Sequence, residues 1–385
     1  MPGLVGFIFA LCTVSSVMAQ NTIHLQVTSL PAYHPSGSII YVAGSFNGWN
    51  PQDENYKFTQ GENGQYTITL SLDQGPHEFK LTRGGWDKAE CLKGGESMAN
   101  RRLEVVGPQV ENIKVEEWLD RLPARPKKST ASPNVKIIDT AFLIPQLKRT
   151  RRIWIYLPEC YDQCSKRFPV IYMQDGQNLF DESTSYTGEW GVDKYLDSLG
   201  STANQSIIVG IDNGSTKRLN EYSPYDVSVK AASGVASRYK GEGDLYVDFL
   251  VKTLKPYIDK NYRTAKNKAN TAIAGSSMGA LISMYAMLKY PRVFGAAGIF
   301  SPAFWLVPGI FDDIKKKGKK VSSNLYFYAG KLESPTLVTD MLKAYEAMSI
   351  HGKAKMQAVI RDEGKHDEAT WRKEFPLFYQ WINTK

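Results

Sequence analysis

Cysteine and histidine are scarce in this chain. Only 4 of its 385 residues are cysteine and 5 are histidine. Three cysteines, Cys91, Cys160 and Cys164, lie beyond the N-terminal segment, too few for a disulfide framework. Cys160 and Cys164 bracket a short loop and could pair in an oxidising compartment. No histidine lies near these cysteines in the sequence, so we predict no zinc site and no other metal site.

Basic residues outnumber acidic ones, but they are not concentrated in one region. The formal net charge is +8 at pH 7. The two short basic clusters, Lys148–Arg152 and Lys315–Lys320, flank a predicted strand and follow a predicted helix. The sequence has no motif that reads a nucleic-acid groove. We therefore expect both clusters to be solvated and predict no nucleic-acid partner.

Long apolar runs are also missing, except at the N-terminus. Residues Met1–Ala19 are apolar and uncharged, with their most apolar stretch at Leu4–Val14 and small residues before Gln20. This segment is shorter than the roughly 20 residues that a membrane helix needs, and it has the pattern of a cleaved signal peptide. We therefore predict a signal peptide over residues 1–19, no membrane span, and a mature protein that is secreted or periplasmic.

The length of the chain suggests two domains. Residues 20–118 contain short alternating segments separated by Gly, Pro, Asn and Asp turns, which predicts a small β-sandwich. The expected strands include His24–Thr28, Ser38–Ala43, Tyr66–Leu70 and His77–Thr82. Residues 119–134 contain three prolines with Lys, Ser and Thr, which is typical of a semi-rigid, solvated linker.

The first predicted domain resembles carbohydrate-binding modules of families 48 and 20. The resemblance is carried by Val42–Asn50, Phe79-Lys80, Gly85-Trp86 and Asn100-Arg101. It implies that sugar rings stack on Trp49 and Trp86 while Lys80 and Asn100 bond sugar hydroxyls, because apolar sugar faces suit large aromatic rings. The alternative is that the two tryptophans are packed in a core or against the second domain, as a structural partner to it.

From residue 135 to 385, strands alternate with helices, which predicts a mostly parallel sheet. A predicted strand, Thr271–Ala274, and a predicted helix, Met278–Tyr290, flank the motif Gly275–Gly279, a G-x-S-x-G sequence. This context is typical of a nucleophile placed on a sharp strand-to-helix turn. We therefore predict Ser277 as the nucleophile and the Met278 N–H as one donor of an oxyanion hole.

An acid and a base follow the nucleophile in the order that α/β-hydrolases use. Glu333 follows the predicted strand Asn324–Gly330, and His366 follows the predicted strand Met356–Ile360. Both therefore fall at the sheet edge that carries Ser277, and we predict a Ser277–His366–Glu333 triad. Asp340 and Asp362 remain open as alternative acids. We expect Asp340 to face solvent from a helix and Asp362 to point away from the imidazole.

Another strand end supplies the second oxyanion donor. The predicted strand Phe168–Asp175 leads into Gly176, which permits a sharp turn that aims the N–H of Gln177 at the substrate oxygen. We place four further side chains at the substrate. These are Asp175, Trp190, Arg218 and Trp305.

The second domain resembles the putative-esterase branch of the α/β-hydrolases, over about residues 135–385. The matching motifs are Tyr172–Gln177, Arg218–Pro224, Gly275–Gly279, Gly330–Ser334, and Gly364–Asp367 with Trp371. The branch contains feruloyl and acetylxylan esterases of carbohydrate esterase family 1, and the enterochelin esterases; some members carry Asp where this chain has Glu333.

The resemblance implies a secreted serine esterase that needs no cofactor and acts on acylated carbohydrate or another acylated small molecule. The alternatives are a siderophore-ester hydrolase, favoured if Arg218 binds an anionic chelate, and a non-catalytic polysaccharide-binding protein. The sequence makes no prediction of oligomeric state.

Overall fold

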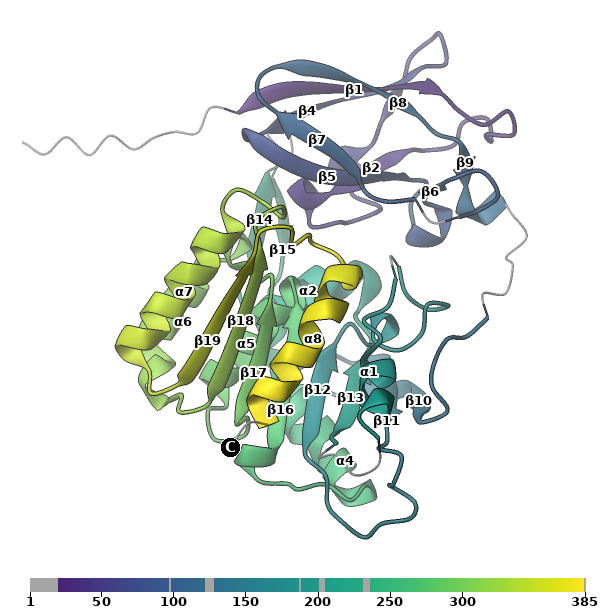
Figure 1. Cartoon of the computed structure of the whole chain (residues 1–385). Coiled ribbons are helices and arrows are strands. Elements are labelled where there is room, and N and C mark those ends of the chain that lie inside the picture. The colour runs from purple at the N-terminus through teal and green to yellow at the C-terminus, as the bar shows by residue number, and fades with distance from the viewer. Residues whose placement is uncertain are drawn as a thin grey trace, which may run out of the picture.

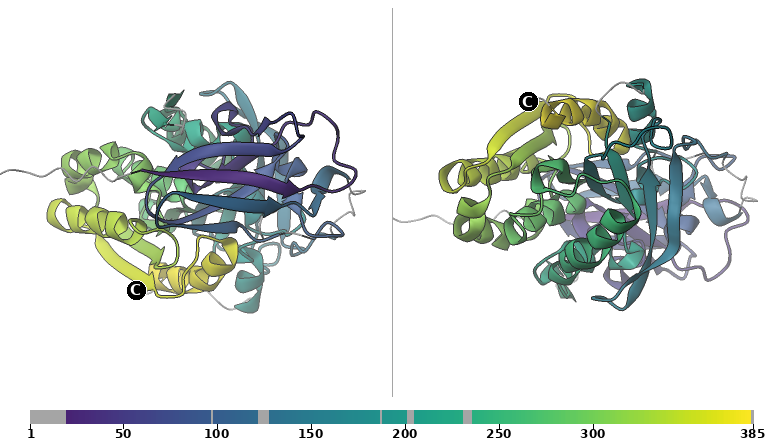
Figure 2. Two further views of the ribbon diagram at one scale, coloured as in Figure 1. Left: turned by 90° about the horizontal axis from the view of Figure 1, so that it is seen from above. Right: turned by 90° about the horizontal axis from the view of Figure 1, so that it is seen from below.

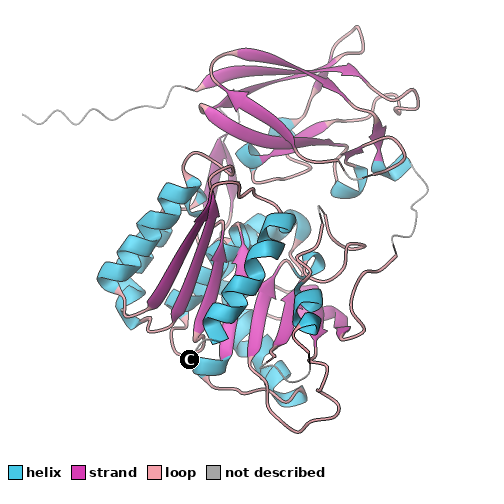
Figure 3. Cartoon of the chain, in the orientation of Figure 1, coloured by secondary structure: helices cyan, strands magenta, loops and turns pink. Residues whose placement is uncertain are grey.

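The chain folds into an N-terminal β-sandwich module and a C-terminal α/β-hydrolase domain (Figure 1; Figure 3). The computed structural model describes residues 20–96, 98–121, 128–186, 188–200, 205–230 and 236–383. The predicted signal peptide, residues 1–19, lies outside the described residues. The predicted fold class is confirmed, with a mostly parallel sheet in the second domain and mostly antiparallel strands in the first.

The module consists of one four-stranded, one three-stranded and one two-stranded sheet, in the orders β3-β4-β1-β8, β2-β5-β7 and β6-β9. The alternation of apolar residues seen in the sequence buries one face of each main strand between the two larger sheets. The strands are β1 (Asn21–Ser29), β2 (Tyr41–Gly44), β3 (Thr59–Gln60), β4 (Tyr66–Leu72), β5 (Gly75–Thr82), β6 (Glu90–Cys91), β7 (Arg101–Val105), β8 (Gln109–Lys114) and β9 (Glu117–Trp118).

The second half of the predicted linker is exposed at residues 128–130 but is hydrogen-bonded to the hydrolase domain. The Ser129 hydroxyl donates to Asp181 Oδ2 at 2.6 Å and the Thr130 hydroxyl donates to Glu189 Oε2 at 2.8 Å. Asn134 Nδ2 donates to Asp197 Oδ1 at 2.9 Å. The acceptors are carboxylates of the hydrolase domain, and the composition of the linker alone does not indicate these bonds. Residues 122–127 of the linker lie outside the described residues.

The hydrolase domain is organised on an eight-stranded sheet of order β10-β11-β13-β12-β16-β17-β18-β19. The pairs β10–β11 and β11–β13 are antiparallel and the remaining neighbours are parallel. The strands of this sheet are β10 (Val135–Ile144), β11 (Arg149–Tyr156), β12 (Val170–Gln174), β13 (Ile207–Ile211), β16 (Thr271–Ser276), β17 (Ala296–Phe300), β18 (Asn324–Gly330) and β19 (Lys355–Arg361). A separate hairpin joins β14 (Val227–Lys230) to β15 (Ala236–Tyr239).

Helices cover both faces of this sheet. α1 and α8 pack on one face, and the larger group from α2 to α7 packs on the other. The helices are α1 (Val192–Ser198), α2 (Arg218–Tyr222), α3 (Gly243–Phe249), α4 (Lys255–Asn261), α5 (Met278–Lys289), α6 (Gly309–Lys317), α7 (Leu337–His351) and α8 (Glu368–Asn383). None of the helices within the described ranges is long and apolar enough to cross a membrane.

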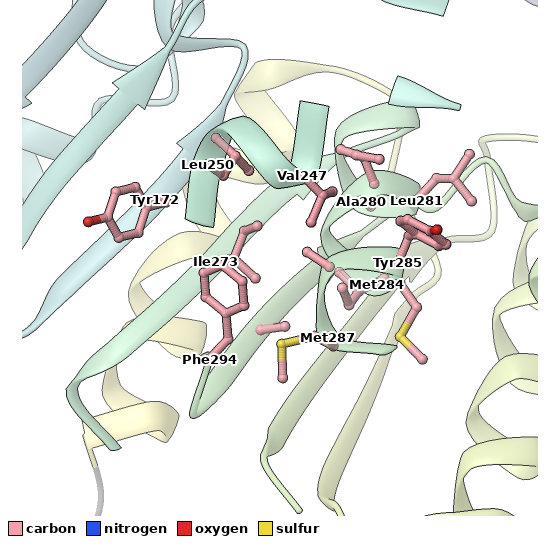
Figure 4. Close-up of a cluster of buried hydrophobic side chains, with 14 of the residues drawn as sticks. Tyr172, Val247, Leu250, Ile273, Ala280, Leu281, Met284, Tyr285, Met287 and Phe294 are labelled. Atoms are coloured by element: carbon pink, nitrogen blue, oxygen red, sulfur yellow. The ribbon is translucent and has the colours of Figure 1, made fainter. Parts of the chain in front are cut away.

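Helix α5 carries apolar residues on every side because it is buried on every side. Its residues from Met278 to Leu288 are all buried, because the sheet lies beneath it and other helices flank it. Figure 4 shows Met284 and Met287 of α5 in one cluster of buried side chains with Ile273 of β16. This packing fixes the helix against the strand that precedes it, and so holds the turn between them.

One predicted helix is irregular. The segment predicted as a single helix over Gly243–Tyr262 is α3, a π-helical turn at Leu250–Leu254, and α4. Pro256 lies at the start of α4 and cannot donate a backbone hydrogen bond. The bonding pattern therefore changes just before the proline, as in other π-bulges.

The module lies over the carboxyl edge of the hydrolase sheet (Figure 1), and the view from above shows its strands across that domain (Figure 2). Asn50 Nδ2 of the module donates to the Tyr239 hydroxyl at 3.3 Å, and that hydroxyl donates to Asp53 Oδ2 at 3.2 Å. The sheet edge where parallel strands end is where α/β proteins bind ligands. The module therefore covers the place where an active site is expected.

Candidate active site

Ser277 stands on a strained turn between β16 and α5. Its backbone angles are φ 56° and ψ −120°, a conformation that costs a non-glycine residue free energy and is found at functional sites. The turn is tight because Gly275 and Gly279 face each other. A Cβ on Gly275 would lie 2.7 Å from the carbonyl carbon of Gly279. The steric reason for the G-x-S-x-G pattern is thus present in the fold.

His366 and Glu333 are hydrogen-bonded to each other. The distance from His366 Nδ1 to Glu333 Oε2 is 2.6 Å, and the Glu333 side chain is fully buried. The other carboxylate oxygen, Oε1, accepts from the Gly330 N–H at 2.5 Å and from the Ser301 hydroxyl at 2.8 Å. Three contacts thus hold the carboxylate in one orientation, with Nε2 of the imidazole left for another partner.

The environment of His366 favours its charged form. Burial opposes that form, but the hydrogen bond and negative charge of Glu333 outweigh it and raise the pKa of His366 above its ordinary value. The ring of Trp371 meets the imidazole edge-on, with centroids 5.1 Å apart and planes at 82°. This contact fixes the plane of the imidazole. Glu333 and Trp371 together give His366 the position and the basicity that a proton acceptor needs.

Ser277 and His366 line one cavity of about 240 Å³ together with Met278. The N-terminal module supplies the opposite wall of this cavity. The four residues predicted to bind sugar in the module, Trp49, Lys80, Trp86 and Asn100, all line it. The structure therefore brings these residues to the predicted catalytic serine rather than to a separate surface of the module.

Asp175 and Arg218 also line the cavity, as a bonded pair. Arg218 Nε donates to Asp175 Oδ1 at 2.7 Å and Nη2 donates to Oδ2 at 2.9 Å. Burial alone would lower the pKa of Arg218, but the charge and hydrogen bonds of Asp175 raise it above its ordinary value. Asn213 Nδ2 donates to the same carboxylate at 2.7 Å. A bidentate pair of this kind holds its geometry well.

Two predicted substrate residues lie outside the cavity lining. Trp190 is only 3% exposed and packs between Phe300 and Trp371, with ring centroids 5.1 and 5.6 Å away. It is a core residue, so its prediction as a substrate contact is wrong. Trp305 is 43% exposed in the short helical turn after β17 and is not among the residues that line the cavity.

Gln177 lies in the turn that follows β12, as predicted. It is 4% exposed, and its side-chain Oε1 accepts from the Asn213 N–H at 3.2 Å. A Cβ on the preceding Gly176 would lie 2.8 Å from the backbone of Gly210, so glycine is required there. Gln177 itself is not among the residues that line the cavity, although its neighbours Asp175 and Asn178 are. The oxyanion roles of Gln177 and Met278 remain predictions.

Neither alternative acid reaches the imidazole in place of Glu333. Asp362 bonds Lys331 at 2.8 Å with its side chain 82% exposed, in agreement with the expectation that it does not face the imidazole. The expectation for Asp340 is wrong, because this residue is 7% exposed rather than solvated. It bonds Lys343 on the same helix at 3.2 Å. The side of α7 that carries Asp340 packs inward, which the helix pattern did not indicate.

Sequence reasoning missed several residues at the site, among them Ser301 and Tyr186. Ser301 follows β17 at the edge that carries Ser277, and it has a positive φ of 48°. Its position just past a strand end was a usable signal. Tyr186 lines the cavity and lies against Trp86, with ring centroids 6.4 Å apart. It comes from a loop, and no sequence signal indicated it.

The cysteines beyond the N-terminal segment are free thiols in this structure. The Sγ atoms of Cys160 and Cys164 lie 3.0 Å apart as thiols, in the short loop after β11. Cys91 is a buried free thiol. Among the residues that the structure describes, no group of three His, Cys, Asp or Glu side chains is arranged to hold a metal ion.

Comparison with known proteins identifies relatives of each domain. The chain is 31% identical over 155 residues to the uncharacterized protein YbbA of Bacillus subtilis, 40% of this chain and 58% of YbbA. It is 26% identical over 223 residues to an endo-1,4-beta-xylanase/feruloyl esterase of Xylanibacter ruminicola, 57% of this chain and 27% of that protein. The N-terminal region is 39% identical over 95 residues to an alpha-amylase of Niallia circulans, 24% of this chain and 7% of that protein. The chain thus spans less than two thirds of the length of each of these relatives.

The fold of both domains together has a solved counterpart. The enterochelin esterase of Shigella flexneri matches with a TM-score of 0.52 and 18% identity, over 90% of this chain and 88% of that one. A family model described as Putative esterase matches residues 144–379. That range is more than half of the chain and contains Ser277, Glu333 and His366. The chain therefore belongs to the Putative esterase family of the α/β-hydrolases.

Proposed function

We propose that the protein is a serine esterase that hydrolyses acyl esters of carbohydrate through Ser277, His366 and Glu333. The observation that carries this proposal is the 2.6 Å bond between His366 Nδ1 and Glu333 in the cavity that Ser277 lines. Glu333 fixes the tautomer of the imidazole and stabilises the imidazolium formed during attack. A dead scaffold would have no need for the strained backbone of Ser277.

The proposed reaction has two acyl-transfer steps. His366 Nε2 takes the proton from the Ser277 hydroxyl, Oγ attacks the ester carbonyl, and the N–H groups of Met278 and Gln177 stabilise the oxyanion. His366 then protonates the leaving alcohol. Water repeats the attack on the acyl-enzyme, with His366 again as the base, and releases the acid.

Aromatic acyl groups, such as feruloyl, suit the cavity best among the candidate substrates. Trp49, Trp86 and Tyr186 contribute aromatic surface to its lining. A relative whose name includes feruloyl esterase supports the same substrate class. An acetyl group is the smaller alternative on the same type of carbohydrate.

Arg218 gives little support to a siderophore-ester hydrolase. Its guanidinium is bound by both oxygens of Asp175 and is therefore not free to pair with an anionic chelate. The fold shared with an enterochelin esterase is compatible with either substrate.

A panel of esters tests the proposed function. Methyl ferulate, p-nitrophenyl acetate, acetylated xylan and a tricatechol siderophore ester separate the substrate classes. Ser277→Ala should remove turnover of every active substrate with the fold retained, while Ser276→Ala serves as the matched control. If Ser277→Ala kept more than a few per cent of wild-type turnover and Ser276→Ala were inactive, the nucleophile would be wrong.

We also propose that the protein is exported, because Met1–Ala19 has the pattern of a signal peptide. N-terminal sequencing of the extracellular or periplasmic protein should give a chain that begins at Gln20. A chain that retained residues 1–19 in the cytoplasm would contradict this proposal.

A further inference from the structure

A buried carboxylate other than that of Glu333 lies at the active-site cavity. Glu368 is the first residue of α8 and follows His366 by two positions in the chain. It lines the cavity together with Ser277 and His366, although it is only 7% exposed. The reaction proposed above gives this carboxylate no role.

A hydrogen bond joins Glu368 to the turn that follows β12. Asn178 Nδ2 donates to Glu368 Oε1 at 2.9 Å, and both residues are buried. Asn178 is itself fixed, because its backbone N–H donates to the Asp175 carbonyl at 2.9 Å and its own carbonyl accepts from the Trp190 N–H at 2.8 Å. The bond therefore gives the Glu368 side chain a defined orientation. It uses one of the roughly four acceptor positions of an ionised carboxylate.

The place of Glu368 beside His366 indicates which part of a substrate it meets. In the proposed reaction, His366 Nε2 gives its proton to the oxygen of the leaving alcohol. The charge of Glu368 reaches the imidazole. Burial lowers the pKa of His366, Glu333 raises it most, and Glu78 and Glu368 raise it further. A group this close to the proton donor is placed to meet the alcohol part of the ester.

The chemistry of a carboxylate limits the group that Glu368 can bind. In its ionised form a carboxylate only accepts hydrogen bonds, so its ligand must present a donor. A hydroxyl group is such a donor, whereas an ether oxygen is not. An alcohol that keeps a free hydroxyl group after one of its oxygens is acylated, such as a sugar or another polyol, meets this requirement.

We infer that Glu368 is a specificity-determining residue of the esterase, accepting a hydrogen bond from a free hydroxyl group on the alcohol part of the ester. The inference rests on the proposed esterase function and deepens it, because Glu368 would select esters of sugars or other polyols over esters of simple alcohols. It assigns recognition of the alcohol to the hydrolase domain, independently of the tryptophans of the module.

Glu368 also contributes to the structure, and one substitution separates the two roles. An acidic side chain in the first turn stabilises a helix, and the bond to Asn178 ties α8 to the turn that carries Gln177. Glu368→Gln keeps the shape of the side chain and an oxygen that accepts from Asn178. Its amide, however, presents N–H donors where the carboxylate presents an acceptor.

The test uses esters of one acid with three alcohols of similar size. 2-Hydroxyethyl ferulate presents a hydroxyl group, propyl ferulate has a methyl group in its place, and 2-methoxyethyl ferulate has an ether oxygen that cannot donate. The corresponding acetates form a second set, so that the result does not depend on the acyl group. The quantity compared is kcat/KM for the hydroxyethyl ester divided by that for the methoxyethyl ester, with the propyl ester as the reference for each.

We expect the wild-type enzyme to prefer the hydroxyethyl ester and Glu368→Gln to lower this ratio about tenfold. The variant loses a hydrogen bond to a charged acceptor, and its N–H donor favours the ether oxygen. Glu368→Asp keeps the charge and should keep a preference for the hydroxyethyl ester. The matched control is Glu363→Gln, an exposed glutamate on the loop before His366, which should leave the ratio unchanged.

Two results would overturn the inference while the proposed function stands. The first is an active wild-type enzyme that hydrolyses the hydroxyethyl and methoxyethyl esters equally well, and this measurement needs no variant. The second is a Glu368→Gln variant, folded by thermal melt, that loses the same factor on both esters, as a purely structural role predicts. A wild-type enzyme inactive on every ester of both sets would reject the esterase proposal and the inference with it.

Discussion

The cavity has one wall from the hydrolase domain and one from the N-terminal module, here called the hydrolase wall and the module wall. The charged groups of the two walls differ in whether they have a partner of opposite charge. On the hydrolase wall, Asp175 accepts hydrogen bonds from Nε and Nη2 of Arg218, and His366 is bonded to the buried Glu333. On the module wall, Lys80 has no carboxylate within 4.0 Å in the described part of the chain. A paired group keeps its geometry before a substrate arrives. We therefore expect the hydrolase wall to carry out the proposed chemistry and the module wall to contribute to substrate recognition.

Substitution of Glu333 is expected to have the largest effect on kcat, and it tests whether the hydrolase wall carries out the chemistry. Glu333→Gln keeps the size of the side chain but removes the charge that stabilises the imidazolium. We expect kcat to fall by up to about 10⁴ for every ester, as for the corresponding acid of serine proteases. Because Glu333 raises the pKa of His366, the acid limb of the kcat/KM profile should also move to lower pH in any residual activity.

The control for Glu333→Gln is Asp362→Asn, which removes an exposed carboxylate on the adjoining loop. It should stay within a few-fold of wild type, as should Asp340→Asn. Steady-state kinetics of the three variants on one substrate gives the ranking. If Asp362→Asn or Asp340→Asn were the inactive variant, the assignment of Glu333 as the catalytic acid would be wrong. The hydrogen bond between Glu333 and His366 would then not be part of the catalytic machinery.

Substitution of Ser301 should have a smaller effect on kcat than substitution of Glu333. Its hydroxyl donates to Glu333 at 2.8 Å and accepts from Trp371 Nε1 at 2.9 Å. Ser301→Ala leaves Glu333 with the Gly330 N–H and His366 as partners, so we expect kcat to fall about tenfold, the effect of one hydrogen bond. KM should be unchanged, because Ser301 does not line the cavity.

A purely structural role for Ser301 would give a different result. The variant also leaves the buried N–H of Trp371 without its acceptor, which costs roughly 1–3 kcal/mol of the free energy of unfolding. A lowered melting temperature with kcat unchanged would show that Ser301 supports packing only. The split between kcat and KM, measured well below the melting temperature, separates the two roles.

The hydrolase wall could be predicted from the sequence because its determinants are local. The Gly275–Gly279 motif between a strand and a helix reflects sterics within a few residues. Glu333 and His366 were found because each follows a strand, and the carboxyl ends of parallel strands meet at one edge. The family model that covers these residues confirms the fold and the esterase family, although not the role of each side chain.

The module wall could not be predicted, because it depends on how two domains pack. The resemblance to carbohydrate-binding modules implied that Trp49, Lys80 and Trp86 bind a ligand, but not that they line the same cavity as Ser277. The same limit explains the error at Trp190. Its burial results from Phe300 and Trp371, which are distant in sequence, so an aromatic residue near the site was mistaken for one that lines it.

The smallest of these effects concerns Trp86, which lies between Trp49 and Tyr186 on the module wall. Trp86→Ala removes one aromatic contact worth about 1 kcal/mol, so KM for methyl ferulate should rise about fivefold with kcat little changed. Trp305→Ala is the matched control, since it removes an exposed tryptophan that does not line the cavity. Affinity electrophoresis in xylan and starch gels completes the test. If Trp86→Ala lost retardation in the gels but kept its KM, the module would bind polysaccharide independently of the active site, and the recognition assigned to this wall would be wrong.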